Sequence, residues 1–255
     1  KPFGRSFRIR PPSRSWCNPK KRQNMNELYL AHTEFIERDA PEIRAFAQNA
    51  VGDAATPREK AVKLFFAVRD GIYYDPYRID PRREAFRATT ILRQGYGYCV
   101  TKAVLLAALL RSQGIACRIH LADVRNHLTT KRLKEMMKTD IFYNHGYNDV
   151  WLDGRWLKVT PTFNLSLCEK FKVKPLDWDG QSDAVLHPFD MEGRRHMEYI
   201  HDHGSFDDLP FDFLVETFIT RYGGSIEEFK RQTDKTSRFE EEAEDEARKF
   251  SANQT

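Results

Sequence analysis

The chain has 255 residues, of which 40% are hydrophobic, and a formal net charge of +4, so it has enough apolar content for one core at the upper size limit of a single domain. The positive charge is concentrated at one end: residues 1–24 hold eight Lys or Arg and no acidic residue, which leaves a mildly acidic remainder without a general nucleic-acid footprint. The same segment lacks an apolar run long enough for a signal peptide or a spanning helix, so we expect a cytoplasmic protein with no membrane partner.

Residues 1–24 are interpreted as a basic disordered leader, because they contain too few apolar residues to repay the entropy of ordering. A basic arm for nucleic acid or anionic lipid is the alternative, and the sequence leaves open whether the leader is native. Globular composition begins at Met25, which places one domain over residues 25–224. Residues 225–255 are a charge-dense C-terminal tail, either a fraying helix or disordered.

Helical signals open the domain. The first helix begins at Pro41, and the second begins in the run TPRE at residues 56–59, which combines a capping box with Pro at the first helical position. The second helix ends at Gly71. Residues 72–74 favour a short strand, and the polar, Arg-rich stretch through residue 87 favours a loop.

The centre of the chain changes from helix to strand. Residues 99–113 are apolar on nearly every side, which is typical of a helix buried in the middle of a domain. Gly114 ends this helix, and residues 115–124 alternate as a strand. Residues 129–138 are expected to be a charged connection.

The clearest β signal is a hairpin over residues 143–159, whose turn at Asp153-Gly154 favours type I′. A helix capped by Asn164 follows, and another is predicted over residues 211–222 from its helical spacing of apolar residues. The predicted fold class is α+β: a helical part with a buried central helix, packed on an antiparallel sheet built from residues 115–159.

The four cysteines, Cys17, Cys99, Cys117 and Cys168, are widely spaced, which argues against a disulfide framework or a zinc ribbon. Cys117 and Cys168 are interpreted as small core residues. Cys99 differs because it begins the buried helix, directly after the run GYGY at residues 95–98. Unpaired N–H groups at a helix start stabilise negative charge, so we expect a lowered pKa and a candidate oxyanion hole.

A thiolate nucleophile needs a base that later protonates the leaving amine. Among the eight histidines, His145 is the candidate because it begins a strand held by a tight hairpin. A lone histidine on a strand is more often structural, so the residues alone leave both interpretations open.

The run 97–118, with G-x-C followed by a buried helix and then G-I-x-x-R, resembles the nucleophile segment of the transglutaminase-like superfamily. The run 145–156, HGYNDVWLDGRW, resembles its histidine segment. The resemblance covers about residues 57–165. It implies a papain-related fold, of the stand-alone bacterial type, with Cys99 as nucleophile and His145 as base. It also implies acyl transfer from an amide or peptide substrate without a cofactor.

The sequence departs from the family pattern at the third catalytic residue. The family has an Asp in a V-D-P-T motif, and here the matching run, Val159 to Thr162, reads VTPT, so Thr160 occupies the acid position. Thr160 can still accept a weak hydrogen bond from the ring, or Asn164 can orient it as in papain-like enzymes. Asp149 is a poor substitute, because four residues along a strand span roughly 13 Å.

Two functional classes therefore stay open. With water as acceptor the chain is a peptidase or amidase, and with an amine as acceptor it is a transglutaminase. Alternatively, the site without its Asp is inactive and the domain is a binding or scaffold module. No sequence feature identifies the substrate or the oligomeric state.

Other motifs carry less weight. The polar segment 196–203 lacks the two helix-compatible spacings that a metal site needs, so no metal ligand is assigned. Gly95 and Gly97 do not form a phosphate loop, since no Gly-Lys-Ser/Thr follows. Several aromatic residues are candidates either for a substrate groove or for the core: Tyr73, Tyr74, Tyr77, Tyr96, Tyr98 and Trp151.

Overall fold

The structure is a computed structural model that describes residues 27–127, 130–222, 239–242 and 244. The basic segment at residues 1–24, including Cys17, lies outside the described residues. So does most of the charge-dense C-terminal tail at residues 225–255. Within these limits, no helix is both long and apolar enough to span a bilayer.

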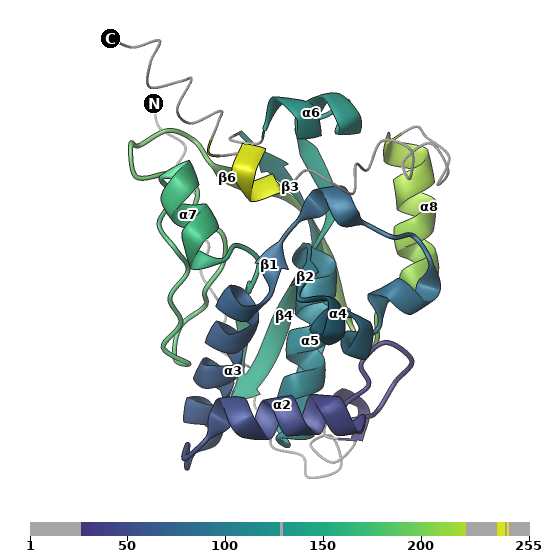
Figure 1. The fold of residues 1–255 in the computed structure, drawn as a ribbon, viewed down its shortest axis with the longest axis vertical. Coiled ribbons are helices and arrows are strands. Elements are labelled where there is room, and N and C mark those ends of the chain that lie inside the picture. Colours follow the sequence, from purple (N-terminus) through teal and green to yellow (C-terminus); the bar gives the residue numbers. More distant parts are fainter. Residues whose placement is uncertain (1–26, 128–129, 223–238, 243, 245–255) are drawn as a thin grey trace, which may run out of the picture.

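The first part of the domain is helical, as the sequence predicts (Figure 1). Its helices are α2 (Pro41–Val51), α3 (Pro57–Gly71), η2 (Pro76–Arg78), η3 (Arg83–Phe86), α4 (Ala88–Gln94) and α5 (Cys99–Ser112). The capping box of α3 is confirmed, because Thr56 Oγ1 accepts from Glu59 N at 3.2 Å and Glu59 Oε2 accepts from Thr56 N at 2.9 Å. The stretch expected to be loop contains the two 3-10 turns, η2 and η3.

The antiparallel sheet has the strand order β5-β4-β3-β6. Its strands are β3 (Cys117–Asn126), β4 (Ile141–Leu152), β5 (Arg155–Val159) and β6 (Met197–Phe206). The predicted hairpin turn is confirmed, since Asp153 and Gly154 have φ of 51° and 82°, the two positive values of a type I′ turn. The sheet extends beyond the predicted residues 115–159, because β6 pairs with β3.

A small parallel pair lies beside the start of α5. Strands β1 (Tyr73–Tyr74) and β2 (Tyr96–Gly97) align Tyr73 with Tyr96 and Tyr74 with Gly97. This pairing confirms the predicted short strand at residues 72–74. It also fixes the chain immediately before Cys99 against a segment from another part of the sequence.

The remaining helices correct one prediction and confirm two. The expected connection at residues 129–138 contains α6 (Lys131–Met137), capped by Thr130, whose Oγ1 accepts from Leu133 N at 3.3 Å. Its buried apolar positions are few and stand among charges, so the helical period is weak in the sequence. The predicted α7 (Leu165–Phe171) and α8 (Phe211–Tyr222) are present.

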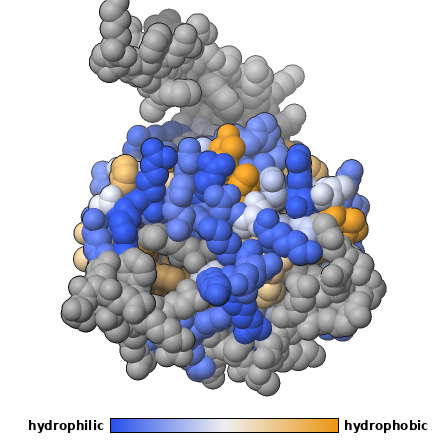
Figure 2. Space-filling view, turned by 90° about the horizontal axis from the view of Figure 1, so that it is seen from above, coloured by the Kyte–Doolittle hydropathy of each residue, from blue (hydrophilic) through white to orange (hydrophobic). Residues whose placement is uncertain are grey.

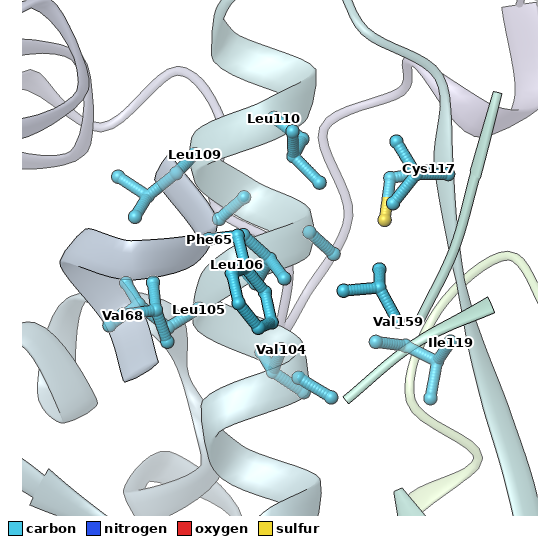
Figure 3. Packing of buried hydrophobic residues seen from close by; sticks show 14 of the residues in the cluster. Phe65, Val68, Val104, Leu105, Leu106, Leu109, Leu110, Cys117, Ile119 and Val159 are labelled. Atoms are coloured by element: carbon cyan, nitrogen blue, oxygen red, sulfur yellow. The ribbon is translucent and has the colours of Figure 1, made fainter. Parts of the chain in front are cut away.

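Helix α5 lies at the centre of the core, between the other helices and the sheet (Figure 1). Leu105 and Leu109 lie on the side of Val68 in α3, whereas Leu110 lies on the side of Cys117 in β3 (Figure 3). Because the helix is covered on all sides, its sequence has no polar face. On the face of the molecule shown in Figure 2, by contrast, the coloured residues are mainly hydrophilic, with hydrophobic residues in small separate patches.

The described part of the charge-dense C-terminal tail packs on the domain. Residues 239–242 are helical, and the Phe239 side chain is 4% exposed. Its ring makes edge contacts with Tyr74 and Tyr77 at centroid distances of 5.6 and 5.3 Å. These residues are therefore helical, as one of the two expected alternatives had it, but they pack on the domain, because the charged sequence contains one large apolar side chain. The domain boundaries at residues 24 and 224 stay predictions.

Candidate active site

Cys99 begins α5, as predicted, and is 6% exposed. The preceding turn is held by Thr101, whose Oγ1 accepts from Tyr98 N at 3.0 Å. Gly95 adopts a left-handed φ of 71°, whereas Gly97 is needed for space, because a Cβ there would lie 2.6 Å from Thr101 Oγ1. The turn before the helix therefore requires both glycines, for different reasons.

Strand β4 passes directly over the start of α5. A Cβ on Gly146 would lie 2.6 Å from Val100 Cα, so only glycine allows the two backbones to approach this closely. The backbone N–H groups of Gly146, Val100 and Cys99 itself lie close enough to the Cys99 sulfur to act against the rise in the pKa of its thiol. Gly146 is a site residue that the sequence analysis did not identify, because nothing local distinguishes it from other strand glycines.

The protonation of Cys99 differs from the sequence-based expectation. Burial raises the pKa of the thiol to about 11, although the N–H groups of Gly146 and Val100 act to lower it. The expected lowering of the pKa is therefore wrong for this structure. The physical reason is that removal of water penalises the thiolate more than three N–H dipoles favour it.

His145 is 4% exposed, and burial lowers the pKa of its ring to about 3. Its Nε2 atom is buried without a hydrogen-bond partner, and among the described residues no hydrogen bond joins the ring to Cys99. Both side chains nevertheless line the same pocket. The structure therefore brings the two predicted residues to one site as a neutral thiol and a neutral imidazole.

Thr160 occupies the acid position at the end of the β5 segment and is fully buried. Its backbone N–H donates to Ala184 O at 2.9 Å, whereas its Oγ1 has no aligned hydrogen-bond partner. The Tyr199 hydroxyl lies close enough to Thr160 for their interaction to lower the pKa of Tyr199, although desolvation is the larger effect and raises it to about 12. The acid position thus interacts with a second neutral hydroxyl.

Tyr199 belongs to β6 and was not identified from the sequence. Its ring centroid lies 6.1 Å from that of His145 and 6.0 Å from that of Tyr147. Its hydroxyl accepts from Leu186 N at 3.4 Å. Only the pairing of β6 with β3, which the sequence analysis did not predict, brings this side chain to the site.

Asn164 lies elsewhere in the hydrogen-bond network. Its Oδ1 accepts from Tyr74 N at 3.1 Å and its Nδ2 donates to Ser166 Oγ at 2.8 Å. The amide therefore binds the β1 segment and the first turn of α7, and it is not directed to His145. It also does not cap α7 through its side chain, although it occupies the N-cap position.

Asp149 is engaged in a separate polar cluster on the sheet, so it does not orient His145. Its Oδ2 accepts from Arg118 Nε at 2.8 Å and lies 3.0 Å from His120 Nδ1. The other ring nitrogen, His120 Nε2, lies 2.6 Å from Asp202 Oδ1. Hydrogen bonds with His120 lower the pKa values of both carboxyl groups despite desolvation.

The cluster reaches the site through stacked rings. The His120 ring stacks on Tyr147 at 4.5 Å, and Tyr147 stacks on His145 at 6.0 Å. Part of the polar segment 196–203 therefore has a role in the strand pairing and in this cluster. Within the described residues, no group of three His, Cys, Asp or Glu side chains is arranged to hold a metal ion.

The other two described cysteines are core residues, as predicted. Cys117 and Cys168 are buried, and burial raises the pKa of each thiol to about 12.

The aromatic residues that the sequence offered as groove or core candidates lie in different places. Tyr74 and Tyr98 line the pocket beside Cys99, whereas Tyr73 is exposed.

Comparison with known proteins identifies the family of the central segment. Residues 44–161 match the family model of the transglutaminase-like superfamily. Among curated proteins, no match was found. A candidate cysteine protease from Cytophaga hutchinsonii has a similar crystal structure, with 14% sequence identity, a TM-score of 0.44, and coverage of 71% of this chain and 46% of that protein.

A second crystal structure is that of a candidate protease from Parabacteroides distasonis ATCC 8503, with 19% identity and a TM-score of 0.34, covering 52% of this chain and 25% of that protein. The chain thus spans about half the length of the first protein and a quarter of the second. The family match contains Cys99, His145 and Thr160. Over residues 44–161, which contain both predicted catalytic residues, the chain is therefore similar to the transglutaminase-like superfamily.

Proposed function

We propose that the chain catalyses acyl transfer or hydrolysis on an amide or peptide substrate through a thioester on Cys99, with His145 as the base. The match of residues 44–161 to the superfamily supports a cysteine-dependent hydrolase or transferase in general. The observation that carries the finer proposal is the geometry at the start of α5. There, the backbone N–H groups of Gly146 and Val100 lie near the Cys99 sulfur and favour its thiolate, and His145 lines the same pocket as Cys99.

The neutral pair sets the order of proton movement. Because the thiol pKa is raised and the imidazole pKa is lowered, the resting site holds its proton on sulfur. As Sγ bonds to the substrate carbonyl carbon, the thiol proton passes to His145. The C–N bond then breaks, the amine leaves with the proton from His145, and the acyl group remains on Cys99 as a thioester.

The second half of the reaction regenerates the thiol. Water or an amine attacks the thioester carbonyl while His145 removes its proton, and the proton returns to the departing sulfur. The backbone N–H groups beside the sulfur are the candidate donors to the oxyanion of each tetrahedral intermediate. The choice between water and amine decides between a peptidase or amidase and a transglutaminase.

The neutral hydroxyl at the acid position favours a second candidate, an inactive binding or scaffold module. In a Ser-His-Asp triad the Asp contributes a factor of about 10⁴ in kcat, because it fixes the tautomer of the histidine and stabilises its charged form. Here His145 Nε2 has no partner, and Thr160 Oγ1 has no aligned one. A ring nitrogen without a partner and a hydroxyl in place of the carboxylate are what we expect of a site that has lost its catalytic Asp.

The test is acylation by p-nitrophenyl acetate at pH 7.5, followed by intact-mass spectrometry. A working pair gives one acetyl group on the protein and a burst of p-nitrophenol. Cys99→Ala abolishes both, and His145→Gln slows the burst at least 100-fold, consistent with the range of general-base catalysis of about 10² to 10⁴. Cys168→Ala is the matched control and leaves the burst unchanged, because that thiol is buried away from the pocket.

The outcomes separate the two candidates. Acylation of Cys99 that does not depend on His145 would refute the role of the base and support the scaffold. Complete absence of acylation, with native thermal stability, would refute the catalytic proposal.

A further inference from the structure

The pocket beside Cys99 is formed by segments that are distant in the sequence. One wall comes from the chain around η2 and η3, a second from α6 and the start of β4, and a third from α8. Cys99 and His145 lie in this lining. The other lining residues are predominantly apolar, and they include Ile79, Phe86, Met137, Phe142, Leu214 and Phe218.

Helix α8 presents an apolar face to this pocket, and the side chains of that face are only partly buried. Leu214, Val215 and Phe218 line the pocket and are half-buried, and α8 has no fully buried residue. On the same helix Ile219 is 47% exposed and lies outside the pocket lining. The pocket-facing residues thus retain apolar surface that a bound apolar group can remove from water.

Charge is scarce in the lining. Among the described lining residues, Lys138 is the one Lys, Arg, Asp or Glu, and its side chain is exposed. No carboxylate in the described lining can pair with a basic substrate side chain. A charged side chain would lose its hydration in this pocket without a paired group to replace it.

We propose that the pocket holds a large aliphatic or aromatic side chain on the acyl side of a peptide substrate, at the residue whose carbonyl Cys99 attacks. This inference rests on the proposed function for its reaction. It goes beyond that function by naming the substrate class. The nucleophile lies in the pocket wall, so a side chain inserted there is attached close to the attacked carbonyl.

The test measures covalent labelling of Cys99 by acetyl-Xaa chloromethyl ketones with Xaa as Leu, Phe, Ala, Asp or Lys. The thiol displaces chloride from the reagent, so labelling reports pocket occupancy without catalytic turnover. Leu has three more carbons than Ala, and at about fourfold per buried methylene the preference approaches roughly sixtyfold for complete burial. We expect at least tenfold preference for Leu and Phe over Ala, and slower labelling still for Asp and Lys.

Two matched variants on α8 test whether the Leu-over-Ala labelling preference arises from the pocket lining. Phe218→Ser is expected to reduce the Leu-over-Ala ratio at least threefold, whereas Ile219→Ser leaves it unchanged, because Ile219 is outside the lining. Thermal unfolding of both variants checks the fold. If Phe218→Ser does not fold, the labelling series on the unmodified chain still decides the inference.

The results separate this inference from the proposed function. A Leu-over-Ala ratio below tenfold overturns the substrate class, even if p-nitrophenyl acetate acylates Cys99. A ratio of tenfold or more without any acyl turnover supports the pocket assignment and refutes catalysis. Faster labelling by an octanoyl chloromethyl ketone than by the Leu reagent would overturn the peptide side chain in favour of a lipid-like chain.

Discussion

Thr160→Asp restores the carboxylate of the family pattern, and we expect this substitution to change both the pKa of His145 and the stability of the fold. Thr160 is fully buried, and its Oγ1 and the His145 Nε2 both lack an aligned hydrogen-bond partner. A carboxylate near the ring favours the charged imidazole, so it raises the pKa of His145 from its present value of about 3.

The magnitude follows from the burial of both groups. An opposite charge at close range raises a pKa by about one to three pH units, and each pH unit corresponds to about 1.4 kcal/mol. Because a pKa of about 3 raised by about one to three pH units stays below 7.5, the ring is neutral at that pH and the new pair does not offset the penalty for burying the carboxylate, which is several kcal/mol when it is unpaired. We therefore expect a net loss of several kcal/mol in the free energy of unfolding at pH 7.5, together with faster acyl transfer, because the imidazolium forms during the reaction.

The assay compares kcat/KM for p-nitrophenyl acetate between pH 5 and 9 with urea unfolding of the same proteins. Thr160→Val is the matched control, because it removes the hydroxyl and keeps the shape. In the variant with Asp, the imidazolium persists to higher pH, and this change moves the acidic limb of the pH profile upward. If the pH profile of kcat/KM is unchanged and the free energy of unfolding is lower, the ring of His145 does not face residue 160. That result would support the scaffold candidate.

Three further predictions concern stability, each measured by chemical unfolding. Gly146→Ala places a Cβ against the Val100 backbone and is expected to cost about 1 to 3 kcal/mol, with loss of acyl transfer. Lys102→Met removes the buried hydrogen bonds of Nζ to Arg69 O at 2.9 Å and Ile72 O at 2.6 Å and should cost about 2 kcal/mol or more. Because the folded-state pKa of His145 is about 3, below an unfolded value of about 6.5, the unfolded chain binds the proton first. As the pH is lowered from about 6.5 to about 3, stability therefore falls by up to about 1.4 kcal/mol for each pH unit.

Controls for these predictions use positions with similar chemistry. Gly193→Ala adds a Cβ with nothing within 4 Å, although its φ of 77° carries its own backbone strain, so only the Gly146 variant should lose acyl transfer. His145→Gln should make the acid limb of the stability curve shallower, and an identical limb would contradict the lowered pKa. Stability of the Lys102→Met variant within about 0.5 kcal/mol of the unmodified chain would contradict a structural role for its Nζ.

The sequence by itself determined features that depend on neighbouring residues. The capping box at Thr56, the type I′ turn at Asp153-Gly154 and the buried helix that begins at Cys99 follow from side-chain chemistry within a few positions. The family pattern around Cys99 and His145 is also local, and both residues that it singles out line the same pocket.

The tertiary structure alone decided the chemical state and surroundings of that pair. The raised pKa of Cys99 and the lowered pKa of His145 arise from burial by residues distant in the chain, which no local pattern encodes. Tyr199 reaches the site only because β6 pairs with β3. The Asn164 amide was a candidate orienter until its partners on Tyr74 and Ser166 were known, because a polar side chain binds whichever groups the fold places within reach.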